Sequence, residues 1–188
     1  MFFNLPTLLT WARIVAIPLI VGVYYLQLAE PLQNLIGTVL FVVVALTDWA
    51  DGYLARRLNQ MSAFGEFLDP VADKLIVAGA LIVLVYLQRV DMLVALIIIG
   101  REIAISALRE WMAQIGASRS VAVHMLGKVK TVVQMVAIPF LLYHDLLFGL
   151  IDTQLWGTWL LYASAVLTIW SMAYYLQKAL PEIRAKVR

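Results

Sequence analysis

The sequence predicts an all-α integral membrane protein of six transmembrane helices with a short N-terminal interfacial segment. Of its 188 residues, 63% are hydrophobic and only 14% are charged, whereas a soluble domain averages roughly half and a quarter. Six apolar stretches each approach the roughly 20 residues that a membrane-spanning helix needs. Runs such as residues 93–99 are continuously apolar and lack the alternation of a β-barrel strand.

Short connections separate the six apolar stretches. They run over residues 7–26, 35–58, 67–87, 92–115, 128–147 and 153–176. Pro6 precedes the first stretch, and we expect residues up to Thr10 to lie along the interface before the chain turns into the bilayer. No linker, repeat or low-complexity tract interrupts the pattern, so residues 1–188 are expected to form a single membrane domain.

The distribution of positive charge predicts the orientation. Ten of the 14 lysines and arginines fall on one side of the predicted membrane. The positive-inside rule places that side, with both termini, in the cytoplasm. The net charge of +2 is too small to indicate nucleic-acid binding. The absence of cysteine excludes disulfides, thiolate metal sites and cysteine nucleophiles.

Four acidic residues form a spaced set at the cytoplasmic ends of the second and third predicted spans. Asp48 and Asp51 are three residues apart, and Asp69 and Asp73 are four apart, so each pair shares a helix face. An antiparallel hairpin of the two spans brings both pairs to a similar depth. Ionised groups there are costly unless paired, so either some acids stay protonated or cations bind them.

Hard divalent cations are the ions that suit such a cluster. Mg²⁺ and Mn²⁺ favour oxygen ligands, and two metals can clamp the attacking and leaving oxygens of a phosphoryl transfer. In the alternative interpretation, the four acids cap helices and pair with Arg56, Arg57 and Lys74. A small cation transporter would also use intramembrane carboxylates, but it would favour acids near the midplane of several helices. A non-enzymatic membrane scaffold gives no reason for the spacing.

The motif around these acids is specific. It consists of two runs separated by eight residues: Asp48-Trp-Ala-Asp51-Gly52-Tyr-Leu-Ala55-Arg56 and Gly65-Glu-Phe-Leu-Asp69-Pro-Val-Ala-Asp73. Together they resemble the complete signature of the CDP-alcohol phosphotransferase family. The resemblance implies six transmembrane helices, a homodimer and a dinuclear Mg²⁺ or Mn²⁺ site facing the cytoplasm. It also implies an enzyme in which an alcohol displaces CMP from a CDP-linked lipid.

The resemblance assigns roles to the motif residues. It implies that the metal ligands are the four carboxylates, and that one of them, Asp73, is also the general base for the attacking hydroxyl. It implies nucleotide binding by small residues and one arginine of the motif. The expected metal ligands are Asp48, Asp51, Asp69 and Asp73, and the expected nucleotide-binding residues are Gly52, Ala55, Arg56 and Gly65. A topology-setting charge is the alternative role of Arg56.

Basic residues of the fourth and fifth predicted spans indicate an anion pocket. Arg101 lies ten residues into its span, too deep for snorkelling alone. Arg109 follows eight residues later, roughly 12 Å along a helix, so both side chains can border one cavity. With Lys128 and Lys130 they would bind a phosphorylated acceptor. For Arg109, Lys128 and Lys130, anchoring at the cytoplasmic interface is the alternative.

Further motifs resemble a bacterial branch of the same family. They are residues 4–13, residues 101–111 and residues 127–131. This resemblance implies CDP-diacylglycerol as donor and sn-glycerol 3-phosphate as acceptor, with phosphatidylglycerol phosphate and CMP as products at the bacterial cytoplasmic membrane. Inositol phosphate, serine or phosphatidylglycerol are the alternative acceptors. Four N-terminal residues are expected on the nucleotide side, with helix capping as their alternative role: Asn4, Thr7, Thr10 and Arg13.

Overall fold

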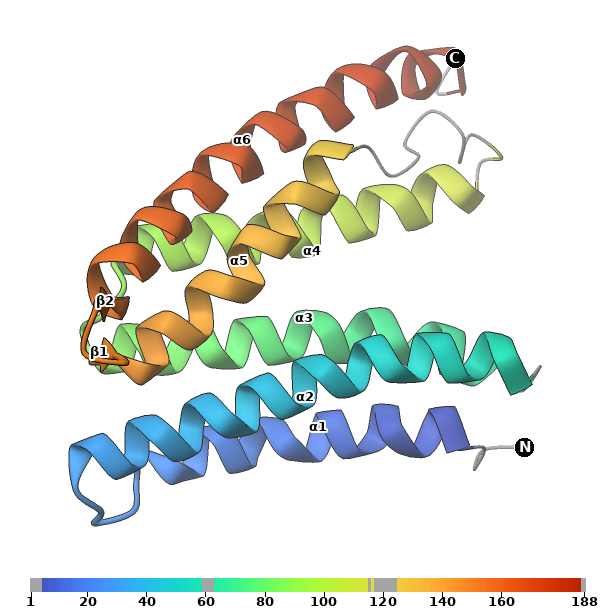
Figure 1. Cartoon of the computed structure of the whole chain (residues 1–188). Helices are drawn as coiled ribbons and strands as arrows, with labels where there is room; N and C mark the ends of the chain where they lie inside the picture. Colours follow the sequence, from blue (N-terminus) through green and yellow to red (C-terminus); the bar gives the residue numbers. More distant parts are fainter. Residues whose placement is uncertain (1–4, 59–62, 115, 117–124, 187–188) are drawn as a thin grey trace.

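The computed structural model describes residues 5–58, 63–114, 116 and 125–186, and these form six helices and one small hairpin. The elements are α1 (Leu5–Val23), α2 (Glu30–Leu58), α3 (Ala63–Tyr86), α4 (Met92–Gln114), α5 (Met125–Tyr143), β1 (Leu146–Leu147), β2 (Ile151–Asp152) and α6 (Thr153–Lys186). The all-α class is confirmed. In Figure 1, α2, α4 and α6 finish at the end of the bundle where α1 begins.

The helices pack as a connected bundle. α1 contacts α2 and α3, α5 contacts α6 and α2, and α4 joins α3 to α6. The core contains large apolar side chains from α2 to α5 that are fully buried, such as Phe41, Leu81, Ile98 and Ile138. Many other large apolar side chains are exposed on the outer faces. An apolar outer surface of this extent suits a lipid environment better than water.

Hydropathy separates the helices into two kinds. Among the described residues, two segments are long and apolar enough to cross a bilayer, Glu30–Thr47 and Thr153–Arg184. Leu8–Val23 and Val129–Tyr143 are apolar but shorter. α3 and α4 each carry four charged residues, more than a typical membrane-spanning segment holds. That six helices span a membrane, with both termini in the cytoplasm, stays a prediction.

The element bounds differ from the expected spans in several places; α2 begins at Glu30 and not at residue 35, and α5 ends at Tyr143 and not at residue 147. α1 is one continuous helix from Leu5 to Val23, so the expected turn after an interfacial segment is wrong, and Pro6 lies in a first helical turn that tolerates proline. α6 continues to Lys186, about 15 Å beyond the expected end at residue 176. The strands β1 and β2 form a two-residue antiparallel pair that was not expected.

One buried arginine ties three elements together at the end of the bundle opposite the termini. Arg89, in the α3–α4 turn, donates through Nη1 to the carbonyls of Leu141 (3.2 Å) and Leu142 (2.9 Å) near the end of α5. Its Nη2 donates to Asn34 Oδ1 (2.8 Å) and Glu30 Oε1 (3.1 Å) at the start of α2. Its side chain is only 4% exposed. The arginine thus satisfies helix-end carbonyls that have no partner within the helix.

Replacing this arginine tests its structural role. Arg89→Met removes donors to four acceptors, and we expect the free energy of unfolding to fall by about 2–3 kcal/mol. Thermal unfolding in detergent, followed by circular dichroism, measures the change. Arg184→Met, at an exposed position of α6, is the matched control. Equal unfolding midpoints for the two variants would contradict the proposed tie.

Candidate functional site

A cavity of about 390 Å³ opens between α3, α4 and α5. It lies in the half of the bundle where α3 and α5 begin and α4 ends. Its lining combines three carboxylates with three cations, and the remaining residues are uncharged. The lining residues are Asp69, Pro70, Asp73, Lys74, Val77, Glu102, Arg109, Lys130, Thr131, Gln134 and Met135.

The acidic face of the cavity rests on a buried arginine from α1. Arg13 donates through Nη1 to Asp73 Oδ1 (2.7 Å) and through Nη2 to Asp69 Oδ1. Thr10 Oγ1 also donates to Asp69 Oδ1, at 2.9 Å. The Arg13 side chain is 2% exposed, whereas those of Asp69 and Asp73 are 43% and 45% exposed. The arginine therefore holds the two carboxylates from the buried side while both still line the cavity.

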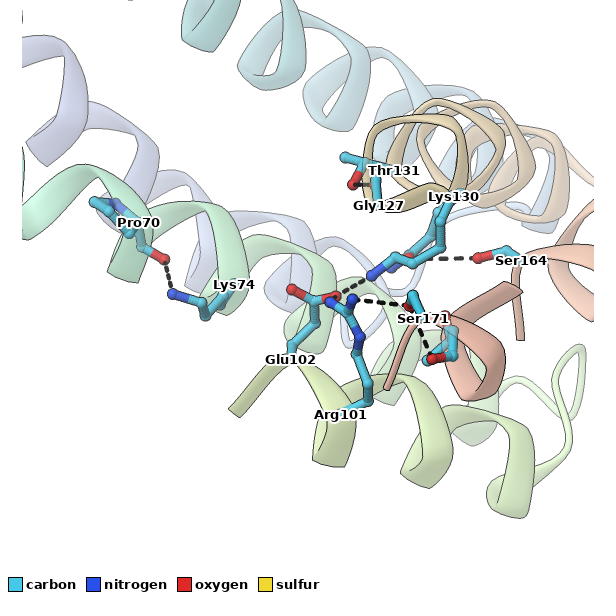
Figure 2. Close-up of polar contacts among 11 residues, drawn as sticks. Pro70, Lys74, Arg101, Glu102, Gly127, Lys130, Thr131, Ser164 and Ser171 are labelled. Carbon is cyan, nitrogen blue, oxygen red and sulfur yellow. Dashed lines mark hydrogen bonds and ion pairs between the residues drawn. The ribbon is translucent and has the colours of Figure 1, made fainter. Parts of the chain in front are cut away.

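The basic face contains an acid that binds two cations. Glu102 Oε1 accepts from Lys130 Nζ and from Arg101 Nη1, the latter at 3.2 Å. Arg101 Nη2 donates to Ser171 Oγ of α6 at 2.9 Å, and its guanidinium lies 5.7 Å from the ring centroid of Tyr175. Figure 2 shows Lys130 and Arg101 both directed at Glu102. This network connects α4, α5 and α6.

Two further cations line the cavity on either side of this network. Lys74 follows Asp73 on α3, and its Nζ donates to the carbonyl of Pro70 at 3.0 Å, as Figure 2 shows. Arg109 lies on α4 two helical turns after Glu102. Its Nε is buried and has no hydrogen-bond partner within the described residues. The cavity thus places an arginine with unused donor capacity opposite two carboxylates.

The structure brings together part of the expected site. Asp69, Asp73, Arg109 and Lys130 line one cavity, as the sequence predicted for residues of three different spans. Arg101 is not among the lining residues, and its expected role at the acceptor phosphate stays a prediction. Its guanidinium is occupied by Glu102 and by groups of α6, because a buried cation needs a nearby acceptor.

The structure places two expected N-terminal residues beside the cavity and adds two lining residues that were not expected. Thr10 and Arg13 contact Asp69 and Asp73 of α3 and so lie on the acidic side of the cavity. Lys74 and Glu102 were not recognised from the sequence as site residues. The signal for Glu102 was present, because an ionisable residue inside a membrane span is by default a functional candidate.

Several expected site residues fall where the structure does not describe side chains. Residues 48–56 lie within helix α2, so the backbone of the motif is helical there as expected. Gly65 lies in the first turns of α3, one turn before Asp69, and is half-buried. Asn4 lies outside the described residues. The residues whose side chains are outside the description are Asp48, Asp51, Gly52, Ala55, Arg56, Thr7 and Lys128.

The described acids fit the donor set of a hard divalent cation. Within the described residues no three acidic or histidine side chains gather closely enough to hold a metal ion. Asp69 and Asp73, however, present carboxylate oxygens one helical turn apart at the cavity wall, and carboxylates are the ligands that Mg²⁺ and Mn²⁺ prefer. A pair of half-exposed acids can contribute to such a site together with ligands from a neighbouring helix.

An apolar groove adjoins the polar cavity. It measures about 430 Å³ and lies between α2 and α5. Met135 of α5 lines both the groove and the cavity. The groove is lined by Leu35, Thr38, Val42, Met135, Val136, Pro139, Phe140, Tyr143, Leu147 and Thr153. A ligand with a charged head and an apolar tail would match these two neighbouring surfaces.

Comparison with known proteins gives a consistent family match. The sequence profile of the CDP-alcohol phosphatidyltransferase family matches residues 3–170. The chain is 48% identical over 181 residues to the CDP-diacylglycerol–glycerol-3-phosphate 3-phosphatidyltransferase of Salmonella choleraesuis (strain SC-B67), covering 95% of this chain and 96% of the relative. The protein of the same name from Escherichia coli (strain K12) gives the same identity and coverage.

The contacts of Arg13 predict that removing its two acidic partners destabilises the protein more than removing the arginine itself. Asp69→Asn with Asp73→Asn removes both carboxylates that accept from the buried guanidinium, and we expect about 3 kcal/mol of destabilisation. Arg13→Met should cost less, because the two acids it leaves are nearly half exposed and water can solvate them. Thermal unfolding in detergent measures both, and the triple variant should recover part of the loss. A larger cost for Arg13→Met than for the double variant would refute this account.

Proposed function

The chain belongs to the CDP-alcohol phosphatidyltransferase family, and we propose that it transfers the phosphatidyl group of CDP-diacylglycerol to sn-glycerol 3-phosphate. The products are phosphatidylglycerol phosphate and CMP, so the protein is a transferase of phospholipid synthesis, a phosphatidylglycerophosphate synthase. The observation that carries this proposal is the 48% identity to relatives named for that reaction, over 95% of the chain. The cavity supports it, because one space is lined both by acids suited to metals and by cations suited to phosphate.

The acids of the motif form the donor side of the proposed site. Asp69 and Asp73, with Asp48 and Asp51 of α2, would hold two divalent cations, Mg²⁺ or Mn²⁺. When bound, such cations neutralise a diphosphate and stabilise its leaving group. Arg13 supports this side by fixing the two α3 carboxylates. The nucleotide would lie against Gly52, Ala55, Arg56 and Gly65.

Asp73 performs the proton transfer in this proposal. The acceptor hydroxyl oxygen forms a bond to the phosphatidyl phosphorus, and the bond from that phosphorus to the CMP oxygen breaks. The hydroxyl proton passes to the Asp73 carboxylate, and the electron pair of the broken bond leaves with CMP. Asp73 suits this role because it lines the cavity and is half exposed, within reach of a bound hydroxyl.

The cations across the cavity form the acceptor side. Arg109 of α4 and Lys130 of α5 line the cavity, and Lys128 lies two residues before Lys130 on α5. A guanidinium binds phosphate through a planar fork of donors, and the Nε of Arg109 has no partner within the described residues. Arg101 would act from behind the cavity wall and not by touching the acceptor.

The groove between α2 and α5 suits the apolar part of the donor lipid. Its lining is almost entirely apolar, and it meets the polar cavity at Met135. A diacylglycerol tail in the groove would keep the diphosphate at the acids. This placement would account for the polar cavity and the apolar groove lying next to each other.

The proposed function also carries a proposed membrane setting. We propose that residues 1–188 form one domain whose six helices span the bacterial cytoplasmic membrane, with both termini and the cavity facing the cytoplasm, and that the protein is a homodimer. The residues that line the cavity come from the half of the bundle where α3 and α5 begin, and Figure 1 shows that α1 begins and α6 ends on the same side. That is the end where the sequence concentrates its basic residues, as the positive-inside rule requires.

An acceptor comparison tests the proposed function. Purified protein in detergent should release CMP from CDP-diacylglycerol only when glycerol 3-phosphate and Mg²⁺ or Mn²⁺ are present. Asp73→Asn should lower turnover at least about a hundredfold while the protein still inserts into membranes. Release of CMP with serine or inositol phosphate, and none with glycerol 3-phosphate, would replace the acceptor. Release without any divalent cation would contradict the metal site.

A bulky side chain in the groove tests the placement of the lipid. Val42 lines the groove and is 37% exposed, whereas the neighbouring Val43 is 53% exposed and is not among the lining residues. Val42→Trp fills space that the donor tail would occupy, so we expect its KM for CDP-diacylglycerol to rise severalfold. The KM for glycerol 3-phosphate should not change. Val43→Trp is the matched control, and equal donor KM values for the two variants would argue against the groove.

A further inference from the structure

Glu102 is the one carboxylate of the described cavity lining that the proposed reaction leaves without a role. It lies on α4 among the cations of the acceptor side, and its side chain is 22% exposed. Two cations donate to the same oxygen, Oε1: Lys130 through its ammonium and Arg101 through Nη1. Both cations are buried, with Lys130 2% and Arg101 8% exposed. The acid therefore compensates two charges that water barely reaches.

Burial makes this compensation necessary. A buried cation that loses its counter-ion carries a large solvation penalty, and it relieves that penalty by moving toward water or by losing its proton. A lysine is especially free to move, because its ammonium is a point charge on a flexible stem. The position of Lys130 at the cavity wall thus depends on Glu102.

Glu102 is itself held from the far side. Arg101 binds it at 3.2 Å and is fixed by Ser171 Oγ at 2.9 Å and by the ring of Tyr175. A chain of contacts therefore runs from α6 through Arg101 and Glu102 to Lys130 and ends in the cavity (Figure 2). An ammonium has three donors, so one contact to Glu102 is compatible with a further bond to a ligand.

We propose that Glu102 is a positioning residue that holds the Lys130 ammonium in place for the phosphate group of the acceptor. Arg101 completes this network by connecting Glu102 to α6. The inference rests on the proposed function, because it assigns the acceptor phosphate to Lys130. It explains why an acid lines the side of the cavity that binds an anion.

Steady-state kinetics with a conservative series tests the proposal. Glu102→Gln keeps the shape and removes the charge, and we expect its acceptor KM to rise about tenfold, equivalent to roughly 1.4 kcal/mol of binding. The donor KM and kcat should stay within about twofold, since the lost contact concerns one substrate. Glu102→Asp retains the charge and should give an acceptor KM between the two. Glu182→Gln, the same change at an exposed position of α6, should match the unmodified protein.

A double-mutant cycle separates positioning from a general structural role. If Glu102 acts through Lys130, adding Glu102→Gln to Lys130→Gln should raise the acceptor KM by less than about twofold further, because interacting sites are not additive. A further tenfold rise on top of Lys130→Gln would overturn the proposal, as would an unchanged acceptor KM in Glu102→Gln. If Glu102→Gln does not fold, the acceptor KM of Glu102→Asp decides, and a value equal to that of the unmodified protein overturns it.

The activity of the unmodified protein separates a failure of the proposed function from a failure of the positioning role. If it releases no CMP with glycerol 3-phosphate, the proposed function fails for that acceptor. If it turns over glycerol 3-phosphate and Glu102→Gln has an unchanged acceptor KM, only the positioning role fails.

Discussion

Charge compensation inside an apolar bundle is the constraint on which the rest of this structure depends. Every buried cation described in the bundle's charged half binds a carboxylate at the cavity wall. Arg13 binds Asp69 and Asp73, while Arg101 and Lys130 share Glu102. Because an uncompensated buried charge costs several kcal/mol, these pairs fix which helix faces turn inward. The cavity is thus lined by carboxylates that also compensate the buried cations of α1, α4 and α5.

Apolar side chains cover the outer surface of the bundle as well as its core. Val15, Val43 and Ile82 are each more than half exposed, whereas the inner faces of the same helices bury Ala16, Val44 and Leu81 in the apolar core. α3 and α4 are not among the segments that meet the length, hydropathy and charge criteria for a membrane span, yet both form part of the same bundle. Asp69, Asp73 and Glu102 of these helices are paired with cations of neighbouring helices, and a count of charged residues does not record such pairing.

The sequence allowed the six helices and four of the cavity's charged lining residues, Asp69, Asp73, Arg109 and Lys130, to be predicted. Apolar stretches of membrane length predicted six helices, and the four-residue spacing of Asp69 and Asp73 predicted a shared face. The partner of those acids was not predictable, because Arg13 lies 56 and 60 residues away in the chain. Periodicity placed Arg101 near the correct depth but could not tell which side of α4 faces the cavity. Only the packing of α6 shows that Arg101 lies behind Glu102.

The balance of charge also indicates why such a cavity calls for divalent cations. The three acids and three cations of the described lining cancel, and Arg13 and Arg101 behind the wall add two positive charges. A phosphate monoester carries about −1.5 to −2 charges at neutral pH, and the diphosphate of the donor adds further negative charge. Two substrates of this charge can therefore meet in a poorly hydrated space only if additional positive charge enters with them, and carboxylates at the wall are the groups that would retain it.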